Sequence, residues 1–93
     1  SLAVKNLLAI VQKRELLVLG EGADIGIQPI PPTLVGKNLG ESQIGAATGL
    51  NVIAIRSNGE SLTNPPASTL LPEGGQLVLV GSAQQHQAFR EFE

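Results

Sequence analysis

The residue types that carry out nucleophilic and acid–base catalysis are scarce in this chain. His86 is the only histidine and Asp24 the only aspartate. A Ser–His–Asp triad would require both to converge on a serine such as Ser42 or Ser61, and no nucleophile-elbow spacing supports that arrangement. His86 lies in a glutamine-rich stretch, so we expect it on the protein surface. The sequence therefore predicts that the chain is not an enzyme. It also predicts no metal site, because His and carboxylate residues do not cluster.

Two glycine-containing stretches resemble nucleotide-binding motifs but lack essential residues. Gly20 and Gly22 begin a dinucleotide fingerprint in which Ile25 occupies the place of the third glycine, and the prolines that follow prevent the required helix. Gly36-Lys37 lacks the earlier glycine and the following Ser or Thr of a phosphate-binding loop. The sequence therefore indicates neither kind of nucleotide site.

Charge and composition argue against further classes of protein. The chain has 93 residues and a net charge of −2, and its six basic residues are scattered apart from Lys13-Arg14. Nucleic-acid binding usually requires a basic stripe or stacked aromatic side chains, so we expect no nucleic-acid partner. Cysteine is absent, which excludes a disulfide framework. The longest apolar run, residues 7–11, is shorter than the ~20 residues of a membrane-spanning helix.

The core of so short a chain must be thin. A domain of this length buries only roughly 60–65% of the surface that its unfolded form exposes, and only 2% of the residues are aromatic. We therefore expect added burial in a homodimer. The chain begins at Ser1 and contains no methionine, from which we expect it to be part of a longer protein.

The hydrophobic pattern predicts a helix in residues 1–14 and one domain in residues 15–93. In the first segment, Val4, Leu7, Leu8 and Val11 follow the i, i+3, i+4, i+7 spacing of a helix. Further apolar residues widen this stripe, so the helix should pack on two sides. We expect its own domain on one side and a partner subunit or upstream domain on the other.

The remaining residues predict strands and helices without regular alternation, which is typical of an α+β fold. We expect a small mixed or antiparallel sheet with flanking helices. Strands are expected at residues 16–19, 23–30, 50–56, 61–63 and 76–81. In the second of these strands, Ile25, Ile27 and Pro29 share one face.

Local signals fix the helices and one turn. Asn38 with a Glu three residues later predicts a helix from there to Thr48, ended by Gly49. Asn58-Gly59 predicts a two-residue hairpin turn. Ser82 with Gln at position 85 predicts a capped helix that runs to the C-terminus.

Gly45 falls in the middle of the first of these helices, where glycine costs about 1 kcal/mol relative to alanine. Either close approach of another backbone or a ligand, or packing of Gly45 against its own sheet, would explain its presence. Both explanations stay open from the sequence.

From Ala23 onward, three motifs occur in a specific order. They are Gly36-Lys37-x-Leu39, then Gly49-x-x-Val52-x-Ala54-Ile55-Arg56, then Pro72-x-Gly74-x-x-Leu77-x-x-x-Gly81. Together they resemble the TrkA-C, or RCK-C, domain family over about residues 23–90. The resemblance implies a small dimeric α+β unit on the cytoplasmic side of potassium channels, potassium transporters and other ion transporters, at the inner face of the plasma membrane.

Some members of this family bind cyclic di-AMP in a cleft between two subunits. Carried onto this sequence, the resemblance implies a ligand-binding set in that cleft, formed by Leu39, Gly40, Ile44, Gly45, Asn51, Val52, Pro65 and Pro66.

Three positions depart from the family pattern. Cyclic di-AMP binders tend to have a branched apolar residue and a basic residue where this chain has Gly40 and Gly45. Loss of the basic residue removes a charge-assisted contact to phosphate. Gly75 stands where the family favours an aspartate, which we interpret as a structural change.

Two hypotheses from different classes follow. In the first, the chain is a regulatory dimer that senses a small effector, cyclic di-AMP or another, and no other cofactor is expected. In the second, it is a purely structural dimerisation module of an ion transporter, and its cleft binds nothing. Gly40 and Gly45 suit close subunit packing and thus the second hypothesis.

Overall fold

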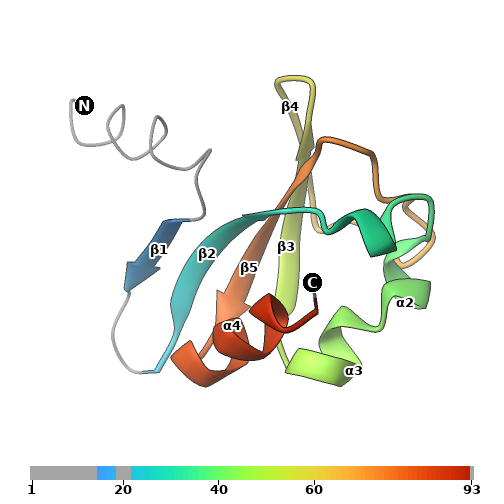
Figure 1. Cartoon of the computed structure of the whole chain (residues 1–93). Helices are drawn as coiled ribbons and strands as arrows, with labels where there is room; N and C mark the ends of the chain where they lie inside the picture. The colour runs from blue at the N-terminus through green and yellow to red at the C-terminus, as the bar shows by residue number, and fades with distance from the viewer. Residues whose placement is uncertain (1–14, 19–21, 93) are drawn as a thin grey trace.

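The computed structural model describes residues 15–18 and 22–92, so the helix expected in residues 1–14 lies outside the described residues. Within them, the chain forms two strands, three short helical segments, three further strands and a final helix, in that order (Figure 1). The strands are β1 (Glu15–Val18), β2 (Asp24–Pro29), β3 (Asn51–Ser57), β4 (Glu60–Thr63) and β5 (Gln76–Gly81). The helices are the 3-10 turn η1 (Pro32–Leu34), α2 (Leu39–Ser42), α3 (Ile44–Thr48) and α4 (Ala83–Arg90).

The strands form one sheet in the order β1-β2-β5-β3-β4, and each neighbouring pair is antiparallel. The last strand of the chain therefore lies at the centre of the sheet. Ile53 interrupts the β3–β5 register as a bulge, so Val52 lies opposite Leu79 and Ala54 opposite Val78. The expected α+β fold with an antiparallel sheet is confirmed.

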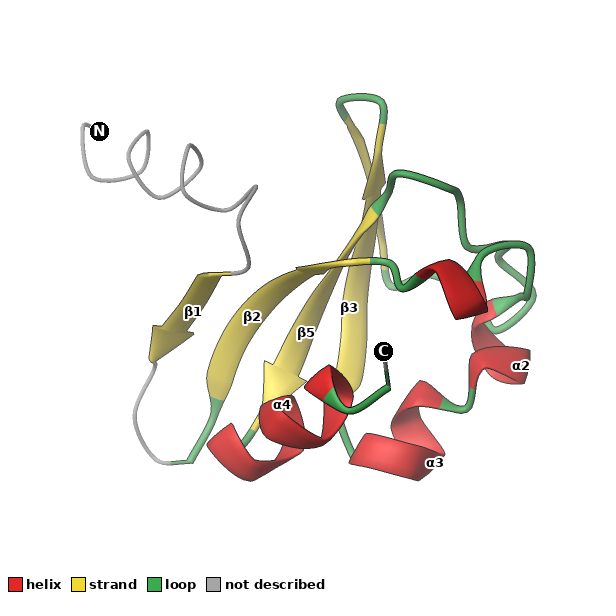
Figure 2. Cartoon of the chain, in the orientation of Figure 1, coloured by secondary structure: helices red, strands yellow, loops and turns green. Residues whose placement is uncertain are grey.

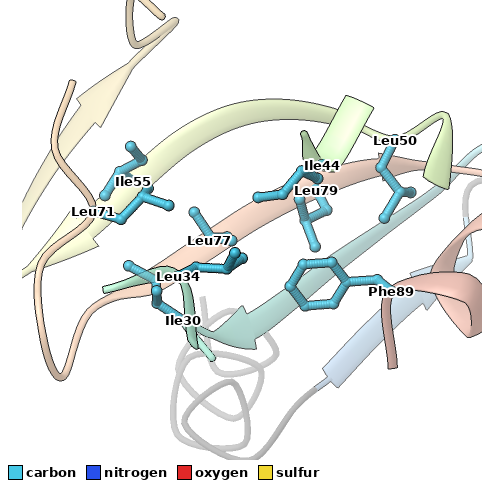
Figure 3. Close-up of a cluster of buried hydrophobic side chains, with 9 residues drawn as sticks. All are labelled: Ile30, Leu34, Ile44, Leu50, Ile55, Leu71, Leu77, Leu79 and Phe89. Carbon is cyan, nitrogen blue, oxygen red and sulfur yellow. The ribbon is translucent and has the colours of Figure 1, made fainter. Parts of the chain in front are cut away.

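All the helices of the described residues lie on the same face of this sheet (Figure 2). They cover an aliphatic core into which α4 inserts the ring of Phe89 (Figure 3). The buried members come from η1, α3, α4, strands and connecting loops, and they are Ile30, Leu34, Ile44, Leu50, Ile55, Leu71, Leu77, Leu79 and Phe89. This one-sided arrangement leaves the opposite face of the sheet without a helix among the described residues.

The predicted caps and turn are confirmed. The Asn38 side chain accepts from the Glu41 backbone N–H at 2.7 Å, and the Glu41 carboxylate accepts from the Asn38 N–H at 2.8 Å. Ser82 and Gln85 form the same reciprocal pair at the start of α4. The β3–β4 turn has φ values of 53° at Asn58 and 79° at Gly59, and the latter is a backbone conformation that glycine adopts without strain.

The single helix predicted from Asn38 to Thr48 is wrong. The chain instead forms α2 and α3, separated by Gln43 with a left-handed φ of 59°. Ser42 stabilises the break, because its hydroxyl donates to the Leu39 carbonyl at 2.5 Å and accepts from the Ile44 N–H at 3.3 Å. This hydroxyl competes with the helical backbone pattern, as serine often does.

The surface position expected for His86 is also wrong. Its side chain is only 1% exposed, and its Nε2 lies 3.0 Å from the backbone carbonyl oxygen of Asp24. Gln84 and Gln87 are exposed on α4, while the His86 ring contacts the Asp24 carbonyl of β2, so the polar composition of this stretch did not predict the burial of His86. No helix of the described residues is long and apolar enough to cross a membrane.

Candidate functional site

The start of α2 is tied to the proline-containing loop that precedes β5. The Leu39 N–H donates to the Thr69 carbonyl at 2.8 Å, and the Gly40 N–H donates to the Ala67 carbonyl at 2.9 Å. The loop itself is closed by a bond from the Thr69 N–H to the Pro66 carbonyl at 3.0 Å. Two segments that lie far apart in the sequence are therefore held side by side.

Gly40 presents an open surface at this junction. It is exposed, and a Cβ atom built on it would meet the Ala67 Cβ and carbonyl oxygen at 3.5 Å, which is ordinary contact. Pro66 is also exposed, whereas Leu39 and Pro65 are half-buried. Four of the eight residues assigned to a ligand site by resemblance thus belong to one surface region.

The other four lie on α3 and at the start of β3. Ile44 is 1% exposed and packs in the core, and Val52 packs against that core while half-buried. Gly45 and Asn51 are exposed. A Cβ at Gly45 would meet only the Leu50 carbonyl oxygen, at 3.7 Å. Neither the sheet nor another backbone segment of the described chain therefore crowds Gly45.

The exposed members of this set are chemically neutral. Gly40, Gly45 and Pro66 offer small or apolar surface, and Asn51 offers an amide that can donate and accept hydrogen bonds. The buried members, Ile44 above all, support this surface from beneath. The set can shape a surface for a ligand or a second subunit, but it supplies no charge to a phosphate.

A groove of about 370 Å³ lies elsewhere, between the β3–β4 hairpin and the loop before β5. It is lined by Ile55, Ser57, Glu60, Ser61, Leu62, Thr69, Leu70 and Pro72. Leu62 and Leu70, 48% and 66% exposed, are the large exposed hydrophobic residues of the described chain, and both line it. Sequence reasoning missed this groove, and the only signals were Leu62 between two polar residues and the Leu70-Leu71 pair, of which Leu71 is buried and Leu70 exposed.

The structure brings His86 and Asp24 together, yet not as a catalytic pair. The imidazole contacts the backbone carbonyl of Asp24 and not its carboxylate, so the aspartate does not orient the ring as it does in a triad. Among residues 15–18 and 22–92, no three His, Asp or Glu side chains lie close enough to hold a metal ion.

The fold is that of the C-terminal regions of RCK proteins. The chain matches the TrkA-C domain family over residues 28–93, and it belongs to that family. The RCK domain of GsuK has 29% identity and a TM-score of 0.72, with 97% of this chain and 20% of that chain covered. The chain thus spans about a fifth of that protein. No curated protein sequence matches it.

Two further structures share the fold at lower identity. The RCK C domain of the potassium transport protein KtrA, in complex with cyclic di-AMP, has 20% identity and a TM-score of 0.68. The match covers 97% of this chain and 95% of that one. S. agalactiae BusR in complex with its busAB-promoter DNA has 19% identity and a TM-score of 0.65. The match covers 98% of this chain and 43% of that one.

The BusR complex corrects the expectation that nucleic acid is excluded as a partner. A protein that contains this fold is seen bound to promoter DNA. The matching region makes up 43% of that chain, so the charge of this region alone does not decide what the whole protein binds. The scattered basic residues therefore cannot exclude nucleic acid.

Proposed function

We propose that this domain is a regulatory, ligand-sensing homodimerisation module of a potassium or other cation transport protein. Membership of the TrkA-C family supports a regulatory role over a catalytic one. The contact of His86 with a backbone carbonyl supports the same view. The proposal places the domain in the cytoplasm, at the inner face of the plasma membrane, where it acts directly on a channel or transporter or forms part of it.

The observation that carries this proposal is the match to the KtrA domain. That structure consists almost entirely of this fold, since 95% of it is covered, and it is described in complex with cyclic di-AMP. A BusR structure is described as an RCK_C domain dimer in complex with the same molecule. These relatives support a ligand role for the fold without help from a further domain.

In the proposed mechanism, the surface around Gly40, Gly45, Asn51 and the Pro65-Pro66 loop faces a second subunit across a cleft. An effector in this cleft would favour one subunit arrangement. It could shift the equilibrium by no more than its difference in affinity for the two arrangements. Ile44, Leu39 and Val52 would fix the floor of the cleft because they are anchored in the core.

A second candidate is a structural dimerisation module that binds no ligand. The observation in its favour is that Gly40 and Gly45 are exposed and uncharged where cyclic di-AMP binders tend to be bulkier and basic. Small exposed residues allow two backbones to approach closely. The two candidates therefore differ in ligand binding and agree in dimerisation.

A thermal-shift series separates them, with cyclic dinucleotides, nucleotides and simple cations as probes. A ligand at 100 times its Kd stabilises the folded state by about 2.7 kcal/mol, which raises Tm by roughly 10 °C or more in a domain of this size. Gly45→Arg restores the missing basic group and should tighten cyclic di-AMP binding by about tenfold or more.

The matched control is Gly45→Ala, which improves helix propensity by about 1 kcal/mol without adding charge. It should raise Tm in the absence of ligand and leave the affinity for cyclic di-AMP unchanged. If no probe shifts Tm for the wild type and Gly45→Arg does not bind cyclic di-AMP, the structural module is the correct function.

Dimerisation has its own test by light scattering over a hundredfold range of protein concentration. We expect the mass of two chains at the upper end of the range. A mass of one chain at every concentration would contradict both candidates, since both require a second subunit.

A further inference from the structure

The second strand of the sheet carries its apolar and polar residues on unexpected faces. Asp24 and Gln28 lie on the face that the helices cover and are 8% and 3% exposed. Ile25 and Ile27 lie on the opposite face, as alternation along a strand requires. An antiparallel sheet with one solvated face normally turns its apolar residues toward the covered side. β2 shows the reverse order.

The register extends this apolar surface across the centre of the sheet. Ile25 lies opposite Val80 and Ile27 opposite Val78, and Ala54 adjoins Val78 from the other side. We call these five residues the aliphatic patch. No helix of residues 15–18 and 22–92 covers it (Figure 2). The polar residues Gln76, Asn51 and Arg56 occupy the same face around it.

The chain itself supplies an apolar segment next to the aliphatic patch. Residues 1–14 lie outside the described part of the structure, and their sequence has the helical apolar stripe of Val4, Leu7, Leu8 and Val11. The segment ends directly before Glu15, the first residue of β1. Glu15 lies opposite Ile27 on β2. Ile27 in turn lies opposite Val78 on β5, and Val78 lies opposite Ala54 on β3, so these residues form one row across the sheet.

The dimensions allow this segment to cross the patch. Three strand spacings of about 4.8 Å separate Glu15 from Ala54 along the row, roughly 14 Å in all. Fourteen residues in helical form span about 21 Å. A segment that turns back at Glu15 is therefore long enough to lie over Ile27 and Val78 and reach β3.

We propose that residues 2–14 dock as a helix on the aliphatic patch of the same chain and form a second, smaller core on the face that α4 does not cover. The inverted pattern of β2 is the consequence, because its isoleucines pack against this segment. The inference stands independently of any effector, since the patch and the candidate ligand surface consist of different residues.

Engineered disulfides test the proposal cleanly because the chain has no cysteine of its own. Val11→Cys is combined with Val78→Cys, and in a second variant with Ile27→Cys, in the full chain. After mild oxidation we expect an intramolecular disulfide in at least one variant. The cross-linked monomer would migrate faster on a non-reducing gel, and its mass would be about 2 Da lower because two hydrogens are lost. Its Tm would also be raised.

The matched control is Asn6→Cys with Val78→Cys, because position 6 lies on the opposite side of the helical stripe. It should form the intramolecular disulfide at least tenfold more slowly. A covalent dimer from the Val11 variants would overturn the proposal by placing the segment on a second copy. Equal rates for Val11 and Asn6, or no disulfide at all, would also overturn it.

An unsubstituted chain provides a second measurement that does not depend on tolerance of cysteine. Nuclear Overhauser contacts are expected between the methyl groups of Val78 and those of Leu7 or Leu8. In a mixture of labelled and unlabelled chains, these contacts should arise within one chain. Their absence, or their appearance between chains, would overturn the proposal.

Discussion

Phe89→Ala is expected to lower the free energy of unfolding by about 3–5 kcal/mol, the usual range for loss of a buried aromatic side chain. Phe89 is 1% exposed and is the only aromatic residue fully buried among those the structure describes. It fills the space between α4 and the sheet, where the other members of the core are aliphatic (Figure 3). Because a domain of this kind has about 5–15 kcal/mol of total stability, this loss is a large fraction of the total and should clearly lower the urea midpoint.

The matched control for this substitution is Phe92→Ala. Phe92 is half-buried, and its ring centroid lies 5.8 Å from that of Phe89. Its removal should cost about 1 kcal/mol, because partial burial and one aromatic contact are lost. Chemical denaturation with urea would measure both values. Equal losses for Phe89→Ala and Phe92→Ala would contradict the central place of Phe89 in the core.

Gly75→Asp should also destabilise the domain, by about 2–4 kcal/mol, although it restores the residue that the family favours. Gly75 is buried, and a Cβ there would lie 2.9 Å from the Arg56 carbonyl oxygen and 3.0 Å from the Ile30 Cδ1. Overpacking of this kind costs about 1–3 kcal/mol. The aspartate would in addition place a charge at a buried position, and burial of a charge costs free energy unless the charge is paired and hydrogen-bonded.

Gly75→Ala separates these two effects, because it adds the Cβ without the carboxylate, and should lose about half as much stability. Glu73→Asp, at an exposed position of the same loop, should leave the urea midpoint unchanged. A Gly75→Asp variant as stable as the wild type would show that the backbone at Arg56 moves aside readily. That outcome would contradict the close packing described for this corner.

Local signals predicted much of this fold correctly. The reciprocal caps at Asn38 and Ser82 and the turn at Asn58-Gly59 depend on side chains that bond to backbone groups within a few residues. Such interactions are visible in a short stretch of sequence. The strands predicted at 23–30 and 76–81 likewise match β2 and β5 closely, because branched aliphatic residues and flanking turns mark their limits.

Features that depend on distant partners could not be predicted in this way. The left-handed break at Gln43 has no local signature of its own, since glutamine rarely adopts positive φ. His86 is buried because the carbonyl of Asp24, 62 residues earlier, meets its ring. The groove between Leu62 and Leu70 likewise exists only when the hairpin and the loop meet.

The candidate site likewise combines features that the sequence could predict with features that it could not. Resemblance to the family named the eight residues, and the structure places Gly40 beside the Pro65-Pro66 loop through backbone hydrogen bonds. The sequence alone could not tell that Ile44 faces the core while the adjacent Gly45 faces solvent. That distinction depends on the short α3 helix and its orientation after the break at Gln43. Whether these residues bind a ligand stays a prediction.

The central position of β5 also determines the order in which the domain can be completed during synthesis. β2 and β3 have no contact with each other in the ladder except through β5, which is the last strand to be made. Until residue 81 has left the ribosome, the two hairpins present unpaired edges to their surroundings, and such edges promote aggregation. A nascent chain that stalls before residue 76 therefore has no continuous sheet, and the rate of translation through β5 should influence the yield of folded protein.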